Sequence, residues 1–225
     1  IADDLWASLR FGTAFTSEGD RQFYYAGAVD YRPLDGLQIR FDADHDYHAV
    51  SPRAIDRNIH RYNQEITVSW QLPDLRHHLV VSAGYAAFSD GNRSYVVAVE
   101  PRRAILRSQH LNLDLGVSGR WSGFMHDLNN GYYDPNLYEQ YLVVLYGYVK
   151  LSEDDGISFT IAPGVNKDDR QKNYTFSGYL NAEATFGFSR DWQLRIAGGT
   201  GLSIGVAETT TYHRSYGLAR LLRRF

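Results

Sequence analysis

Apolar and polar residues alternate at every second position through most of this 225-residue sequence. In the segment 192–206, the odd positions hold polar or small residues, and the even positions include the large apolar ones: Trp192, Leu194, Ile196, Leu202, Ile204 and Val206. A period of two places successive side chains on opposite faces of a β-strand. The alternation therefore predicts long strands whose two faces lie in different solvents.

Turn sequences such as LDG, SDGN and EDDG separate the alternating segments and predict about twelve strands. The expected strands are 4–16, 20–33, 36–48, 58–72, 77–89, 93–100, 108–125, 138–152, 155–166, 173–189, 191–207 and 212–225. The segment 101–107 is interpreted as a turn that carries Arg102, Arg103 and Arg107. Because no helical period or linker interrupts this pattern, the sequence predicts one all-β domain over residues 1–225.

The length of the expected strands favours a membrane barrel over a soluble sandwich. They run to about 10–16 residues, whereas strands of soluble sheets average about 5–6 and a membrane-crossing strand needs about 9–11. Aromatic residues such as Trp70, Trp121 and Trp192 fall near strand ends, where interfacial girdles are expected. We predict a transmembrane antiparallel up-and-down β-barrel of about twelve strands, with more if the N-terminal part is truncated.

The expected connections differ in length between the two ends of such a barrel. With twelve strands, both termini lie at one end, where the turns are mostly short, and the segments 49–57, 126–137 and 167–172 lie at the other end. Short periplasmic turns and longer external loops are typical of outer-membrane barrels. The sequence thus predicts a bacterial outer-membrane protein with both termini in the periplasm, surrounded by membrane lipids and lipopolysaccharide.

Charged residues lie in the middle of strands on the face opposite to the apolar one. A sandwich core would not hold so many charges without a large penalty, whereas a water-filled lumen accommodates them. We interpret these residues as lining a lumen and a substrate path: Arg10, Arg40, Asp42, Asp44, Glu65, Asp114, Arg120, Glu183 and Arg195.

The chain ends on Phe225, after a strand in which Gly217, Ala219 and Leu221 share one face. In this respect the sequence resembles bacterial outer-membrane β-barrels, which commonly end on Phe as an insertion signal. The resemblance implies that the barrel assembly machinery recognises the last strand and that this strand pairs with the first. Arg223 departs from the pattern, because an apolar or aromatic residue usually stands there.

The segment GYYDPNLY, with Gly131, Tyr132, Tyr133, Pro135 and Tyr138, carries a closer resemblance. It resembles the C-terminal barrel of exopolysaccharide export proteins of the cellulose synthase operon protein C type, over roughly residues 130–225. The resemblance implies a channel for a secreted polysaccharide, preceded in a longer chain by a periplasmic scaffold of helical repeats and in contact with that scaffold or a synthase complex. Tyr132, Tyr133 and Tyr138 either stack on sugars at the exit or belong to an aromatic girdle.

Two other functions fit the same fold. One is a general or solute-selective porin. The other is an outer-membrane acyl hydrolase, because His213 and Ser215 form a His-x-Ser pair on one strand face, although no Asn or Glu that would orient the histidine lies nearby. We expect the chain not to be an enzyme.

Composition and spacing argue against metal, cofactor and nucleic-acid sites. The acidic run at Asp42, Asp44 and Asp46 lacks the glycine and the distal glutamate of a calcium loop, and the chain has no cysteine. The net charge of -3 leaves no basic surface for nucleic acid. We therefore expect no metal and no cofactor.

Overall fold

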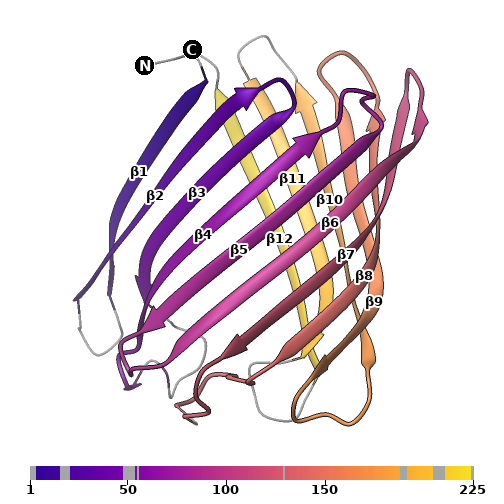
Figure 1. Ribbon diagram of the computed structural model, residues 1–225. Helices are drawn as coiled ribbons and strands as arrows, with labels where there is room; N and C mark the ends of the chain where they lie inside the picture. The colour runs from indigo at the N-terminus through magenta and orange to yellow at the C-terminus, as the bar shows by residue number, and fades with distance from the viewer. Residues whose placement is uncertain are drawn as a thin grey trace.

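The structure is a computed structural model that describes residues 4–15, 21–47, 54, 56–128, 130–187, 192–204 and 211–223. Within these residues, twelve antiparallel strands form one sheet in which each strand pairs with its neighbours in sequence (Figure 1). The strands are β1 (Leu5–Phe15), β2 (Arg21–Leu34), β3 (Leu37–Tyr47), β4 (His60–Gln71), β5 (His77–Phe88), β6 (Arg93–Arg107), β7 (Leu111–Phe124), β8 (Tyr138–Lys150), β9 (Gly156–Asp168), β10 (Thr175–Gly187), β11 (Trp192–Ile204) and β12 (Thr211–Arg223). Among the described residues, no helix is long and apolar enough to cross a membrane.

The strand positions confirm the sequence pattern, with one clear error at the end of β6. This strand continues to Arg107, so Arg102, Arg103 and Arg107 lie in a strand and not in a turn. Proline at 101 has no amide hydrogen for one pairing bond, yet it does not end the strand. The structure keeps Pro101 opposite Leu79 of β5, and only the pairing with β7 is interrupted there.

The two ends of the sheet differ in their connections. We call the end where β1 begins and β12 ends the termini end, and the opposite end the loop end; the termini end is at the top of Figure 1. Connections at the termini end are short, as in 35–36 and 108–110, whereas 48–59 and 125–137 are the long segments at the loop end. In the turn 35–36, Gly36 has a φ of 79°, and a Cβ there would lie 2.4 Å from the carbonyl oxygen of Gln71, so this turn requires glycine.

Burial along the strands is inverted relative to a soluble protein. On β4, Ile66 and Trp70 are 45% and 44% exposed, whereas Asn63, Glu65 and Thr67 on the other face are only partly exposed. Apolar side chains are therefore the outward ones, as expected when lipid rather than water surrounds the sheet.

Side chains of the polar face meet across intervening strands, which identifies this face as the concave one. Gln140 of β8 donates a 2.8 Å hydrogen bond to Ser177 of β10, across β9. Tyr146 of β8 donates a 2.6 Å hydrogen bond to Glu100 of β6, across β7. Figure 1 shows the same curvature, because the sheet curls until β10 to β12 pass behind β2 to β6. The fold is thus an up-and-down membrane barrel with a polar interior, as predicted.

Two small apolar clusters lie on the concave side. One is near the loop end and contains Ala54, Ile59, Ala86, Phe88 and Tyr132. The other is built by Leu142 and Val144 of β8 with Ala162 of β9. Most of the interior wall is polar, so the pairing between strands supplies the continuous framework of the fold.

The expected pairing of the last strand with the first is not formed by the described residues. Over 4–15 and 211–223, β1 pairs with β2 and β12 pairs with β11. Phe225, the predicted assembly signal, lies outside the described residues.

Candidate functional site

The strand registers bring the predicted lumen charges onto a single surface. Arg10 lies opposite Ala26, and Ala26 lies opposite Asp44, so these residues share a face. Asp42 lies opposite Glu65 in the same way. Because directly opposite residues point to the same side of a sheet, continuing this comparison to β12 places all nine predicted residues on the concave face.

Five of these nine side chains are tied to neighbours on the concave face. Arg40 holds Asp42 through two hydrogen bonds of 2.7 Å. Asp44 instead binds Arg61 at 3.4 Å and accepts a 3.0 Å hydrogen bond from Asn63. The carboxylates of the acidic run therefore have separate partners, and among the described residues no cluster of three or more His, Asp or Glu side chains is arranged to hold a metal.

At the termini end, Asp114 pairs with Arg107 at 2.5 Å. Arg195 of β11 donates a 3.1 Å hydrogen bond to Gln193.

The other four of the nine, Arg10, Glu65, Arg120 and Glu183, are not engaged in this way. Their side chains make no hydrogen bond or ion pair with another residue in the described part of the chain. They supply two cations and two anions at separate places on the wall. These groups can exchange water for a passing polar ligand without breaking a protein contact.

Sequence reasoning missed a charged cluster in the middle of the concave face. Glu100 accepts hydrogen bonds from Arg102 at 2.5 Å and from Tyr146 at 2.6 Å, and the Arg102 guanidinium carbon lies 4.0 Å from the centre of the Tyr146 ring. The cluster was missed because the strand was predicted to end at position 100. Continuing the alternation past Pro101 would have placed Glu100 and Arg102 together on the inner face.

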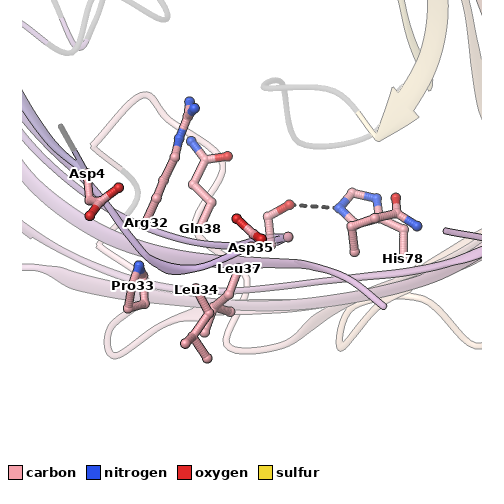
Figure 2. Close-up of a pocket in the computed structure, with 11 residues that line it drawn as sticks. Asp4, Arg32, Pro33, Leu34, Asp35, Leu37, Gln38 and His78 are labelled. Atoms are coloured by element: carbon pink, nitrogen blue, oxygen red, sulfur yellow. Dashed lines mark hydrogen bonds between the residues drawn. The ribbon is translucent and has the colours of Figure 1, made fainter. Parts of the chain in front are cut away.

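A polar hollow of about 780 Å³ lies on the concave face at the termini end. We call it the termini-end pocket, and its polar side chains are Asp4, Arg32, Asp35, Gln38, Ser69, Gln71 and His78. Figure 2 shows Arg32 and Gln38 pointing to one side of the sheet and Leu34 to the other. His78 Nε2 and Ser69 Oγ are 2.7 Å apart and share a hydrogen bond. Carboxylate, guanidinium, amide and imidazole groups of this kind bind hydroxyl-rich ligands through paired donors and acceptors.

At the loop end, the first tyrosine of the GYY motif is a structural residue. Tyr132 is 4% exposed, and its ring stacks on that of Phe88 with centroids 5.4 Å apart. Its hydroxyl donates a 2.8 Å hydrogen bond to Asp90 and accepts a 3.1 Å hydrogen bond from Asn92. Burial and the bond to Asp90 raise the pKa of Tyr132. Stacking of this ring on a sugar would require the loop to open.

Asp90 stays ionised in this loop-end cluster. Burial opposes its ionisation, but hydrogen bonds from the Asn130 side chain, the Asn92 backbone and the Tyr132 hydroxyl outweigh that effect and lower its pKa. Arg57 in turn donates to the amide oxygen of Asn130. Residues from three separate loop segments thus converge on one carboxylate.

Tyr133 lies at a second contact, where the loop 125–137 meets the end of β9. Its hydroxyl donates to Asp168, and Arg170 lies over its ring. Arg170 also binds Asp134 at 3.1 Å and Asp127 at 2.8 Å. Burial of Asp134 raises the pKa of its carboxyl despite these contacts. Tyr138 begins β8 on the concave face and is half-buried.

The His-x-Ser pair lies on the outward, apolar face of β12. Ser215 is opposite Thr200, and its hydroxyl donates a 3.1 Å hydrogen bond to the Thr200 hydroxyl. Position 213 is paired with Leu202 and belongs to the same face by register, while the side chain of His213 lies outside the described part.

The family described as "PgaA membrane beta barrel domain" matches residues 4–160, which is more than half of the sequence. A solved structure described as a "Bacterial polysaccharide outer membrane secretin" superposes with a TM-score of 0.84 and 16% identity, over 100% of this chain and 77% of the other. At this identity the superposition establishes the fold.

Two porin structures are more distant. The KdgM porin matches with a TM-score of 0.46 and 9% identity, over 99% of this chain and 98% of the other. The same porin "in complex with disordered oligogalacturonate" matches with a TM-score of 0.46, 8% identity and the same coverage. No curated protein sequence matches the chain. The family that matches is a membrane barrel domain, which agrees with the prediction of a non-enzymatic chain and confirms its resemblance to exopolysaccharide export barrels.

Proposed function

Because the chain belongs to the family described as the PgaA membrane beta barrel domain, we propose that it passes a secreted polysaccharide across the bacterial outer membrane along its concave face. The observation that carries the proposal is the composition of this face. It combines unengaged charges of both signs with amides, hydroxyls and tyrosine rings over the whole length of the sheet.

A polysaccharide is mostly hydroxyl groups on sugar rings, and a channel for it must bind weakly at many places. Hydroxyls exchange hydrogen bonds between water and planar polar groups at little net cost, so a sliding chain meets no deep energy minimum. Arg10, Glu65, Arg120 and Glu183 are spread over β1, β4, β7 and β10, which provides such contacts around the wall. The polysaccharide would enter at the termini-end pocket.

The same proposal orients the protein. We place the termini end in the periplasm and the loop end outside the cell, because the longer connections 48–59 and 125–137 are at the loop end. Outer-membrane lipids and lipopolysaccharide would then surround the apolar face. The barrel assembly machinery would act on the last strand, and a helical-repeat scaffold in a longer chain, or a synthase complex, would deliver the polymer.

The test is single-channel conductance of the refolded chain in a planar bilayer, with neutral and amino-sugar oligosaccharides added to the termini side. We expect a steady ion current that one class of oligosaccharide blocks reversibly. In the Arg120→Ala and Glu183→Ala variants the blocking constant should change, because these side chains would contact the sugar. A current that no oligosaccharide alters would instead indicate a porin for small solutes and would contradict the proposal.

A further inference from the structure

Two apolar hollows on the outward face each include a proline near which strand pairing is interrupted. Between β6 and β7, pairing stops after Val99 and Gly119 and resumes at Arg102 and Gly116, with Pro101 in the gap. Between β8 and β9 it stops after Leu142 and Gly164 and resumes at Leu145 and Ile161, with Pro163 in that gap. Proline has no amide hydrogen to donate, so a pairing bond is lost at each proline. The first hollow lies over the gap between β6 and β7, whereas the second extends from Pro163 across β10 and β11.

The two hollows differ in charge. The first, which we call the β6 hollow, has a volume of about 330 Å³ and includes His77, Pro101, Arg103, Leu115, Val117 and Val143 in its lining. The second, the β9 hollow, has about 270 Å³ and is lined by uncharged residues, among them Ile161, Pro163, Phe176 and Leu180. Cations therefore border one hollow and not the other.

The cations of the β6 hollow come from two adjacent strands. Arg103 lies directly opposite His77, the first residue of β5, so both are near the termini end of the sheet. Leu115, Val117 and Val143 are 43%, 55% and 50% exposed and continue the hollow toward the middle of the outward face. The site thus has a cationic end at the expected membrane boundary and an apolar end inside the membrane.

Acidic groups near this end do not cancel the positive charge. Asp74 in the turn 72–76 binds His77 Nδ1 at 2.5 Å, so in the protonated imidazole the Nε2–H is left to donate to another ligand. Hydrogen bonds from the Arg76 backbone and the His77 side chain lower the pKa of Asp74 to about 2. The carbonyl of Arg76 accepts a 2.7 Å hydrogen bond from the amide of Ala104, which ties this turn to β6. Arg103 and a protonated His77 together carry one more positive charge than Asp74 cancels.

We propose that the β6 hollow binds one anionic glycerophospholipid, with the phosphate between Arg103 and His77 and an acyl chain along Leu115, Val117 and Val143. An arginine guanidinium matches phosphate oxygens with paired N–H donors, and an apolar recess accepts a hydrocarbon chain. The choice of a glycerophospholipid rests on the proposed orientation, in which the termini end faces the periplasmic leaflet. The site is independent of whether the lumen carries a polysaccharide.

Native mass spectrometry of the full chain with phosphatidylglycerol or phosphatidylethanolamine tests the site. We expect one phosphatidylglycerol molecule to be retained preferentially. Arg103→Gln should weaken its binding about fivefold, the effect of one basic residue at an anionic surface. Val143→Trp, which fills the recess, should weaken binding of both lipids.

Arg93→Gln is the matched control. Arg93 is exposed on the same strand and the same face, at the loop end, and its replacement should leave lipid retention unchanged. Arg103→Lys keeps the charge but loses the paired donors, so its binding should fall between that of the natural chain and that of Arg103→Gln. Folding of each variant is checked by its heat-dependent migration on a gel. Equal retention of the two lipids by the natural chain, or equal effects of Arg103→Gln and Arg93→Gln, would overturn the proposal.

Discussion

The Tyr132 hydroxyl offers a sharp test of how the loop end is held. Tyr132→Phe removes the hydrogen bonds with Asp90 and Asn92 but keeps the ring that stacks on Phe88. A bond to a carboxylate contributes about 1.5–3 kcal/mol and a neutral one about 1, so the loop should lose about 2–4 kcal/mol of local stability. The open population of the loop should then rise by a factor of about 30 or more.

Hydrogen exchange measures this effect directly. The backbone amides of His126 and Leu128 are held by the side chains of Asn92 and Asp134, so their protection reports on the closed loop. In Tyr132→Phe these amides should exchange faster, while amides in the middle of the strands should not change. The control is Tyr174→Phe, which removes an exposed hydrogen bond to Glu139 and should change exchange little. Unchanged exchange at 126–128 in Tyr132→Phe would refute this account of the loop.

Three further predictions concern charge and chemistry. Double replacement of Arg120 and Glu183 by Ala should alter oligosaccharide block more than replacement of the paired Arg40 and Asp42, as measured by conductance. The pKa of Asp90 is lowered in the folded loop, so the ionised carboxylate stabilises the closed loop at pH values above 3.8, the ordinary pKa of this group. This stability is lost as the pH falls through the folded pKa, and the loop amides should lose protection below about pH 4. Asp90→Asn should abolish this pH dependence. Ser215→Ala should leave lipid hydrolysis by the purified chain at background, and a hydrolytic activity that disappears in this variant would show that the chain is an enzyme after all.

The strands, and the face on which each side chain lies, could be predicted because apolar residues contact the membrane and polar residues contact water at alternate positions. This rule placed residues as distant as Arg10 and Arg195 on the same face. It failed at Pro101, where a local signal for the end of a strand was followed although both flanking segments keep their alternation. A missing amide hydrogen interrupts pairing on one side of a strand only, and a sequence does not tell which side that is.

The roles of the loop residues could not be predicted for a different reason. Asp90 and Tyr132 are far apart in the sequence, and neither lies in an alternating segment, so nothing local indicates that they meet. The GYY motif is visible in the sequence, but the burial of Tyr132 depends on packing against Phe88 at the end of β5. Whether each charged side chain of the lumen forms a hydrogen bond or ion pair likewise depends on its neighbours across the sheet.

The central claim is that the concave face is a water-filled path for sugars and that the opposite face contacts lipid. Because the natural chain has no cysteine, single cysteines report on each face without background. They would be placed at Arg120 and Glu183 on the concave face and at Val117 and Leu180 on the outward face, and treated with a charged thiol reagent in lipid bilayers. The account predicts rapid labelling at 120 and 183, slowed by oligosaccharide, and little labelling at 117 and 180. Equal labelling of both faces, or labelling at 120 and 183 that no oligosaccharide slows, would contradict it.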